Sequence, residues 1–195
     1  MDTMETTAAQ AFLSPEEYLA RERKALTKSE YRSGQVYALP GASRKHNIIA
    51  VHVSGELYIQ LKERSCEIYT NDMRVKVSSA GLYTYPDVVV VCEEPQFEDT
   101  HFDTLLNPTV LIEVLSPSTA AYDRGEKFAS YQKLDSLCEY VLISQDRVRV
   151  EHYLRQEQAW DLTEFHSLSN VFRLVSIACE LSLQAIYAKV QFSGS

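Results

Sequence analysis

The sequence lacks several features that would each indicate a particular class of protein. No C-x-x-C pair occurs among its four cysteines, and this scatter argues against a zinc site and against a disulfide framework. The start of the chain has no signal-peptide core, and the longest apolar run, Val88–Cys92, is far too short to cross a bilayer. We therefore expect a protein of the reducing cytoplasm that makes no membrane contact.

The sequence also lacks the excess of basic residues that is typical of nucleic-acid-binding proteins. Its formal net charge is −8, which is the wrong sign for a partner of phosphate backbones. The excess is concentrated, because residues 93–113 hold six acidic residues and no lysine or arginine, whereas residues 1–92 are neutral overall. We interpret the run as a solvated loop that could also repel nucleic acid from one face. The charge weakens a nucleic-acid function without excluding it.

Length and composition indicate a single domain. The chain has 195 residues, of which 45% are hydrophobic, and this content is enough to bury a core without metals or cross-links. We predict a loose segment over residues 1–13, one domain over residues 14–190 and a short tail over residues 191–195.

Two helices are predicted in the first third of the chain. Ser14 as N-cap, Pro15 at the first position and acids in the first turn predict a helix that ends near Leu26. After a hairpin or strand over Tyr31–Leu39, apolar residues recur every four positions from Ser43 and predict a helix of about 18 residues. Its apolar stripe consists of Ile49, Val53, Leu57 and Leu61.

The middle of the chain is rich in strand signals. We predict strands over Glu67–Val77, Thr84–Cys92 and Thr109–Leu115, and the last two are apolar enough to be covered on both faces. A D-x-x-E capping arrangement at Asp123 and Glu126 then predicts a helix to about Leu137, with Phe128, Tyr131 and Leu134 on its apolar side.

The last third begins with a strand over Glu139–Ser144, and two alternating segments after it predict an antiparallel meander. Taken together, the order of elements predicts an α/β or mixed α+β fold with a central mixed sheet flanked by helices.

Two carboxylates lie within the apolar strands. Asp87 follows Pro86 at the start of the run Val88–Val91, and Glu113 lies in the middle of Leu111–Leu115. A carboxylate in a covered strand must be paired, hydrogen-bonded, protonated or bound to a metal, because isolated burial is costly. Each acid alone could be a strand-end residue or half of a salt bridge, but two on neighbouring strands indicate a shared ligand.

Lys127 is the third member of the candidate site. It lies in the first turns of the helix predicted after Asp123, where it is either a solvated lysine or points at the two carboxylates. In the second case, two carboxylates with waters suit Mg²⁺ or Mn²⁺, and the lysine would orient or deprotonate an attacking water. Such a metal polarises a phosphate and lowers the pKa of the water. The chemistry that fits is phosphodiester hydrolysis.

Four segments together resemble the Uma2 family, a group of restriction-endonuclease-like proteins that is also catalogued as a domain of unknown function and is abundant in cyanobacteria. The segments are Tyr85–Val91, Ile112–Ser118, Asp123–Tyr131 and Glu139–Ile143, and the similarity extends upstream to residues 41–47 and 71–75. The resemblance covers roughly residues 14–190.

The resemblance implies a PD-(D/E)XK nuclease core in which Asp87 and Glu113 bind the metal and catalyse. It also implies a Mg²⁺-dependent endonuclease that acts on nucleic acid, with DNA the expected substrate and a homodimer the expected assembly. Leu115 stands where the lysine of the superfamily motif falls. Some members carry that lysine on the following helix, and Lys127 matches this placement. Lys133 lies about 1.7 turns further on and would face nearly the opposite side.

Three further residues are candidates for a supporting role. His46, near the start of the long helix, is either a cap or core residue or faces the metal or a phosphate. Asp72 is either an acid in a turn or an additional carboxylate of the site. Glu30 matches an acid before the first hairpin and could be an extra metal ligand. A basic rim for phosphates is also conceivable, formed by Arg44, Lys45, Arg74, Lys76 and Arg124.

Two other functions stay open. A non-catalytic domain that keeps the nuclease fold for binding or assembly is favoured by Leu115 and by the negative charge. A hydrolase for a small phosphorylated substrate is the other, although no residue pattern indicates its pocket.

Overall fold

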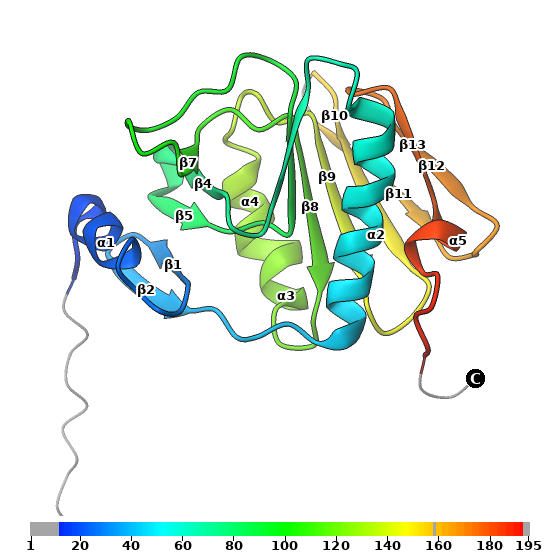
Figure 1. The fold of residues 1–195 in the computed structure, drawn as a ribbon, viewed down its shortest axis with the longest axis horizontal. Coiled ribbons are helices and arrows are strands. Elements are labelled where there is room, and N and C mark those ends of the chain that lie inside the picture. The colour runs from blue at the N-terminus through cyan, green and yellow to red at the C-terminus, as the bar shows by residue number, and fades with distance from the viewer. Residues whose placement is uncertain (1–11, 158, 193–195) are drawn as a thin grey trace, which may run out of the picture.

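A six-stranded mixed sheet forms the centre of the described part of the chain, which comprises residues 12–157 and 159–192 of the computed structural model (Figure 1). The strand order is β11-β10-β9-β8-β6-β3. Strands β8 and β9 are parallel, and all other neighbours are antiparallel. The strands are β3 (Glu67–Thr70), β6 (Val88–Val91), β8 (Val110–Leu115), β9 (Glu139–Ser144), β10 (Val150–Arg155) and β11 (Trp160–Phe165).

The long helix α2 (Arg44–Leu61) covers one face of this sheet (Figure 1). Its four buried residues are the apolar stripe that the sequence predicts, and its 18 residues agree with the predicted length. The stripe packs against the inward side chains of β6, β8 and β9. The same face carries β12 (Val171–Leu174), β13 (Cys179–Ser182) and the short helix α5 (Leu183–Ile186).

A short helical segment covers the opposite face. Helix α3 (Ala120–Tyr122) continues through a π-helical turn, η2 (Asp123–Lys127), into α4 (Phe128–Tyr131). The predicted apolar residues at 128, 131 and 134 are buried there, as expected from their spacing. The predicted end near residue 137 is too late, because α4 ends at residue 131 and turns follow it.

The predicted start of this segment is also wrong. Asp123 and Glu126 lie inside it and do not cap it, since the helix begins at Ala120. Ser116 Oγ accepts a hydrogen bond from the backbone N–H of Thr119, and Thr119 Oγ1 accepts one from the backbone N–H of Ser116. These two residues, and not Asp123, therefore close the turn at which the helical segment begins.

A smaller sheet with strand order β2-β1-β5-β4-β7 lies beside the central one (Figure 1). Helix α1 (Pro15–Glu22) packs against it and has the predicted Ser14 cap, completed by Glu17 in a capping box. The predicted hairpin is present as β1 and β2. The elements of this sheet are β1 (Ser29–Arg32), β2 (Gln35–Ala38), β4 (Arg74–Val77), β5 (Leu82–Thr84) and β7 (Thr104–Leu105), with the 3₁₀ turn η1 (Ser78–Ala80) before β5.

Two predicted strands are each divided between the two sheets. The segment predicted over residues 67–77 turns at Asn71 and Asp72, so its halves are β3 and β4. The segment predicted over residues 84–92 breaks at Tyr85–Asp87 into β5 and β6. Pro86 has no backbone N–H to donate to a strand ladder, which explains the second break. The break leaves Asp87 at the beginning of β6.

A disulfide joins Cys66 to Cys92 and corrects the expectation that the cysteines form no cross-link. The two residues directly flank β3 and β6, whose antiparallel register pairs Glu67 with Val91. The cross-linked positions are 26 residues apart, so their pairing depends on strand register and not on a local spacing. Cys138 and Cys179 are free.

Glu139, in β9, connects the β12–β13 hairpin to the neighbouring strand β10. One of its carboxylate oxygens lies 2.5 Å from His152 Nε2, and the other accepts hydrogen bonds from the backbone and the hydroxyl of Ser176. Burial works to raise the pKa of Glu139, but His152 and Ser176 outweigh it and hold that pKa below its ordinary value.

The expected loose start and tail fall largely outside the description, because residues 1–11 and 193–195 are not among the described residues. Within residues 12–157 and 159–192, none of the helices is long and apolar enough to cross a membrane.

Replacing Cys92 by serine is expected to lower the free energy of unfolding by about 2–4 kcal/mol, because the unfolded chain is no longer restricted by a closed loop. Urea denaturation followed by circular dichroism measures the change. Cys138→Ser removes a free thiol and is the control, with little expected effect. A wild-type protein that unfolds at the same urea concentration with and without dithiothreitol would contradict the cross-link.

Glu139→Gln is expected to cost about 1–3 kcal/mol of unfolding free energy at pH 7, since it removes the negative charge and one of the two oxygens that contact His152 and Ser176. Because the pKa of Glu139 is lowered in the folded protein, its contribution to stability is fully present above the ordinary pKa of 4.5. That contribution is lost as the pH falls through the pKa of the folded state. The difference in unfolding free energy between wild type and variant should therefore become smaller in acid. Glu180→Gln, at an exposed position, serves as control. A gap that stays constant down to pH 3 would refute this account.

Candidate active site

The two strand carboxylates lie opposite each other at one edge of the central sheet. The β6–β8 register pairs Val88 with Ile112, and continuing it by one residue sets Asp87 opposite Glu113. Asp87 Oδ2 accepts a hydrogen bond from the backbone N–H of Val114 at 2.7 Å. The edge therefore brings together the two acids that the sequence singles out.

Lys127 points into the protein and meets Glu113. Its Nζ lies 2.8 Å from Glu113 Oε1, 3.2 Å from Glu30 Oε1 and 3.5 Å from Asp123 Oδ1. All four side chains are at most 6% exposed. The ammonium thus bridges three carboxylates that come from β8, β1 and its own helical segment.

The choice of this lysine over its neighbours agrees with the structure. Lys133, the other lysine of the region, is exposed to solvent. Leu115, at the usual lysine position of the motif, is 4% exposed and packs in the apolar cluster beneath the helical segment. Lys127 is the cation that reaches Glu113.

Glu30 enters the site from the smaller sheet. Its Oε1 accepts a short hydrogen bond from the Thr84 hydroxyl in addition to the contact with Lys127. Its Oε2 lies 3.1 Å from Arg32 Nη2. Burial opposes its ionisation, but Lys127, Thr84 and Arg32 together keep the pKa of Glu30 below its ordinary value. Glu30 is therefore a carboxylate partner of the lysine.

His46 joins the site from the first turn of α2. Its Nε2 lies 3.1 Å from Asp87 Oδ2, and the two side chains are only 15% and 13% exposed. Ser43, the N-cap of α2, accepts the backbone N–H of His46 and sets where this turn begins. The helix that fills one side of the core therefore also supports the acid of β6.

Asp72 is not brought to the site. Its carboxylate is 84% exposed and pairs with Lys28 at 2.8 Å.

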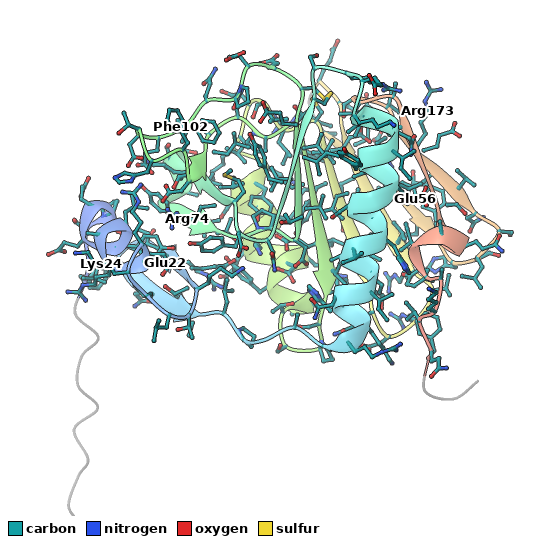
Figure 2. All side chains as sticks on the ribbon, viewed as in Figure 1. Glu22, Lys24, Glu56, Arg74, Phe102 and Arg173 are labelled. Atoms are coloured by element: carbon teal, nitrogen blue, oxygen red, sulfur yellow. A yellow bond between two sulfur atoms is a disulfide. The ribbon has the colours of Figure 1, made fainter. Side chains whose placement is uncertain are left out.

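Three members of the predicted basic rim are neutralised in ion pairs: Arg74 with Asp103, Lys76 with Glu98 and Arg124 with Glu151. Figure 2 places Arg74 toward α1, on the side of the smaller sheet.

Sequence reasoning missed two residues of the site. The Tyr131 hydroxyl donates to Glu113 Oε1 at 3.0 Å, although the sequence showed this residue only as part of an apolar stripe. Asp123, interpreted as a cap, is a buried partner of Lys127. The available signal is spacing, because residues 123, 127 and 131 are four apart and share one face of a helix.

Burial and charge shift the ionisation of the cluster. The pKa of Glu113 is raised to about 8, because burial, together with the charges of Asp123 and Asp87, outweighs the opposing effect of Lys127. Burial alone would lower the pKa of Lys127, but Glu113, Glu30 and Asp123 hold it well above its ordinary value. The lysine stays charged, and an added cation would favour the ionised form of Glu113.

The donor set fits a hard divalent cation. In the described part of the chain, no three or more His, Cys, Asp or Glu side chains gather to hold a metal ion. The remaining donors are the carboxylates of Asp87 and Glu113. Mg²⁺ is commonly bound through one or two carboxylates and keeps several waters, and Asp87 and Glu113 are donors of this type. A structural zinc site, with four protein ligands, is not formed there.

Known proteins resemble this chain in sequence and in fold. Residues 15–185 match the family model Uma2, described as "Putative restriction endonuclease". The protein sll1609 of Synechocystis sp. (strain ATCC 27184 / PCC 6803 / Kazusa) is 40% identical over 162 residues, which cover 83% of this chain and 92% of the relative. The protein slr1290 of the same organism is 37% identical over 180 residues, covering 92% and 94%.

A crystal structure from Anabaena variabilis ATCC 29413, described as "a putative nuclease belonging to DUF820", has the same fold. It superposes with a TM-score of 0.74 at 19% identity and covers 92% of this chain and 99% of its own. At this identity the likeness shows the fold alone, and it confirms the mixed α/β architecture. Together with the family match and the two relatives, it agrees with the resemblance seen in the sequence: the chain belongs to the Uma2 family.

Proposed function

We propose that this protein is a Mg²⁺- or Mn²⁺-dependent endonuclease that hydrolyses phosphodiester bonds of DNA. The observation that carries the proposal is the buried contact between Lys127 and Glu113, on the strand position opposite Asp87. Membership of a family described as restriction endonucleases supports the reaction class. We further propose that two copies act together when both strands of a duplex are cut.

Asp87 and Glu113 would hold the divalent ion. Such an ion polarises the scissile phosphate and lowers the pKa of a water next to it. Tyr131 and Lys127 both donate to Glu113 Oε1, so they fix this carboxylate before any ligand binds. Because side chains held in place pay no reorganisation cost during reaction, this support favours catalysis.

Lys127 and His46 would support the phosphate and the metal-binding carboxylate respectively. The Lys127 ammonium remains charged and would stabilise the negative charge that develops on the phosphate oxygens. His46 Nε2 lies next to Asp87, where its N–H would donate to that carboxylate and orient it.

A second function is favoured by a specific observation. Three carboxylates already surround Lys127, and no metal-binding group of three or more side chains is found among the described residues. A cluster whose carboxylates are already paired with a lysine also suits a non-catalytic domain that keeps the nuclease fold for binding or assembly. Metal binding distinguishes the two functions, because only the nuclease requires it.

Lys127→Ala is expected to reduce DNA cleavage by about 100-fold or more, the usual cost of losing one preorganised charge at a reaction centre. Nicking of supercoiled plasmid in Mg²⁺ or Mn²⁺ measures the loss, and circular dichroism checks that the variant folds. Lys133→Ala, in the exposed turn that follows α4, should cleave like wild type. A folded Lys127→Ala protein with wild-type cleavage would exclude the proposed role.

Asp87→Asn is expected to abolish binding of Mn²⁺ measured by isothermal titration calorimetry, because it removes one of two carboxylate donors. Asp72→Asn changes an exposed carboxylate outside the site and is the matched control, with unchanged binding. If wild-type protein shows no heat of binding at millimolar Mn²⁺, the non-catalytic function is favoured instead.

A further inference from the structure

One edge of the central sheet is formed by the C-terminal ends of its two parallel strands. The register pairs Leu115 at the end of β8 with Ser144 at the end of β9. Between the segments that follow these strands lies a cavity of about 370 Å³ whose lining includes Ser116, Arg124 and Arg147. This volume is within the range of about 300–1,000 Å³ that is common for ligand sites.

The first turn of α2 connects this cavity to the candidate active site. The Ser43 hydroxyl donates a hydrogen bond to Oε1 of Gln145 at 2.5 Å, and Gln145 lies in the turn between β9 and β10. Three residues later, His46 contacts Asp87 at 3.1 Å. Arg44 and Lys45 lie between these two residues in the sequence, in the same first turn of α2.

Three basic side chains at this edge have no carboxylate partner among the described residues: Arg44, Lys45 and Arg147. Arg44 and Arg147 are exposed, and Lys45 is half-buried. By contrast, Glu151 binds both Arg124 and Arg149.

The balance of charge at the edge is positive. One acid, the exposed Asp146, lies beside Arg147 in the cavity lining. The first turn of α2 contains no acidic residue, and its backbone N–H groups add a partial positive charge. The cavity lining therefore contains one acid, and the first turn of α2 beside it contains none.

Two exposed acids of the acidic run over residues 93–113 lie at the opposite edge. Because β6 is antiparallel to β8, the end of β6 lies away from the C-terminal end of β8, and Glu93 and Glu94 follow it there. Both of these acids are exposed. The net charge of −8 therefore does not describe the surface next to the site.

We propose that Arg44, Lys45 and Arg147, named here the basic edge, bind the phosphate backbone of the nucleic acid on which the site acts. The inference rests on the proposed function, because the basic edge borders that site. The three cations come from two elements on either side of the Ser43–Gln145 contact. Several cations on neighbouring segments match the repeated phosphates of a polynucleotide better than one small anion.

The test measures binding without cleavage. Fluorescence anisotropy of a labelled 30-base-pair DNA duplex is followed in EDTA at several NaCl concentrations. Each lost phosphate contact should reduce the slope of log K against log salt by about 0.9. Arg44→Ala, Lys45→Ala and Arg147→Ala combined should reduce it by nearly 3 and weaken binding about 100-fold or more at 0.1 M salt.

Arg173→Ala is the matched control, because it also removes an exposed arginine. Arg173 lies in β12, opposite Glu180 in β13, whose backbone N–H donates to Gln60 near the other end of α2 (Figure 2). The Arg173→Ala variant should bind the duplex with wild-type affinity and with the wild-type slope of log K against log salt.

Several outcomes would overturn the inference. They are a triple variant with wild-type affinity and slope, a wild-type protein that does not bind the duplex, and displacement of the duplex by millimolar inorganic phosphate or pyrophosphate. The last result would indicate a site for a small anion only. A protein that binds DNA through the basic edge but never cleaves it would refute the proposed nuclease activity and leave the inference standing.

Discussion

The buried ammonium of Lys127 and its three carboxylate partners hold together the parts of the protein that form the site. Glu113 comes from the central sheet, Glu30 from the smaller sheet, and Asp123 from the same helical segment as the lysine. Removing charges from water is costly, so each element is restrained to the position in which its charge is compensated. Burial and, to a smaller extent, the neighbouring carboxylates disfavour the ionised form of Glu113, so its pKa rises to about 8 although Lys127 opposes the rise.

The acid of the second strand is positioned by different means. Pro86 interrupts the strand pairing, so Asp87 stands at the beginning of β6 and its carboxylate can accept the backbone N–H of Val114. His46 reaches the same carboxylate from α2. The core packing of that helix thus determines the geometry of the site, because the helix cannot shift without moving the imidazole.

Charge is distributed so that an acidic protein can present a basic surface where a polyanion would approach. Several acids of the run over residues 93–113 form ion pairs with basic residues of neighbouring elements, as Asp103 does with Arg23 and Glu98 with Lys76. The exposed remainder follows β6, at the edge away from the site. Net charge is therefore a poor guide to partners in this fold, since strand direction decides which charges share an edge.

Local patterns in the sequence determined much of the fold. The four-residue period of α2, the Ser14 cap and the apolar strands around Asp87 and Glu113 each depend on neighbouring residues, and the structure contains them. The family resemblance, carried by the same segments, agrees with the family match. The preference for Lys127 over Lys133 came from the family resemblance and from helical spacing, whereas the structure places Lys133 in a turn after α4.

The tertiary structure decided what depends on contacts between distant segments. The sequence could not show that Cys66 and Cys92 flank paired strands, or that the predicted strands over residues 67–77 and 84–92 divide between two sheets. It also gave no sign that Asp72 faces solvent while Tyr131 holds Glu113. Periodicity reports which face of an element is buried, whereas strand register and ion-pair partners are set by the packing of whole elements against each other.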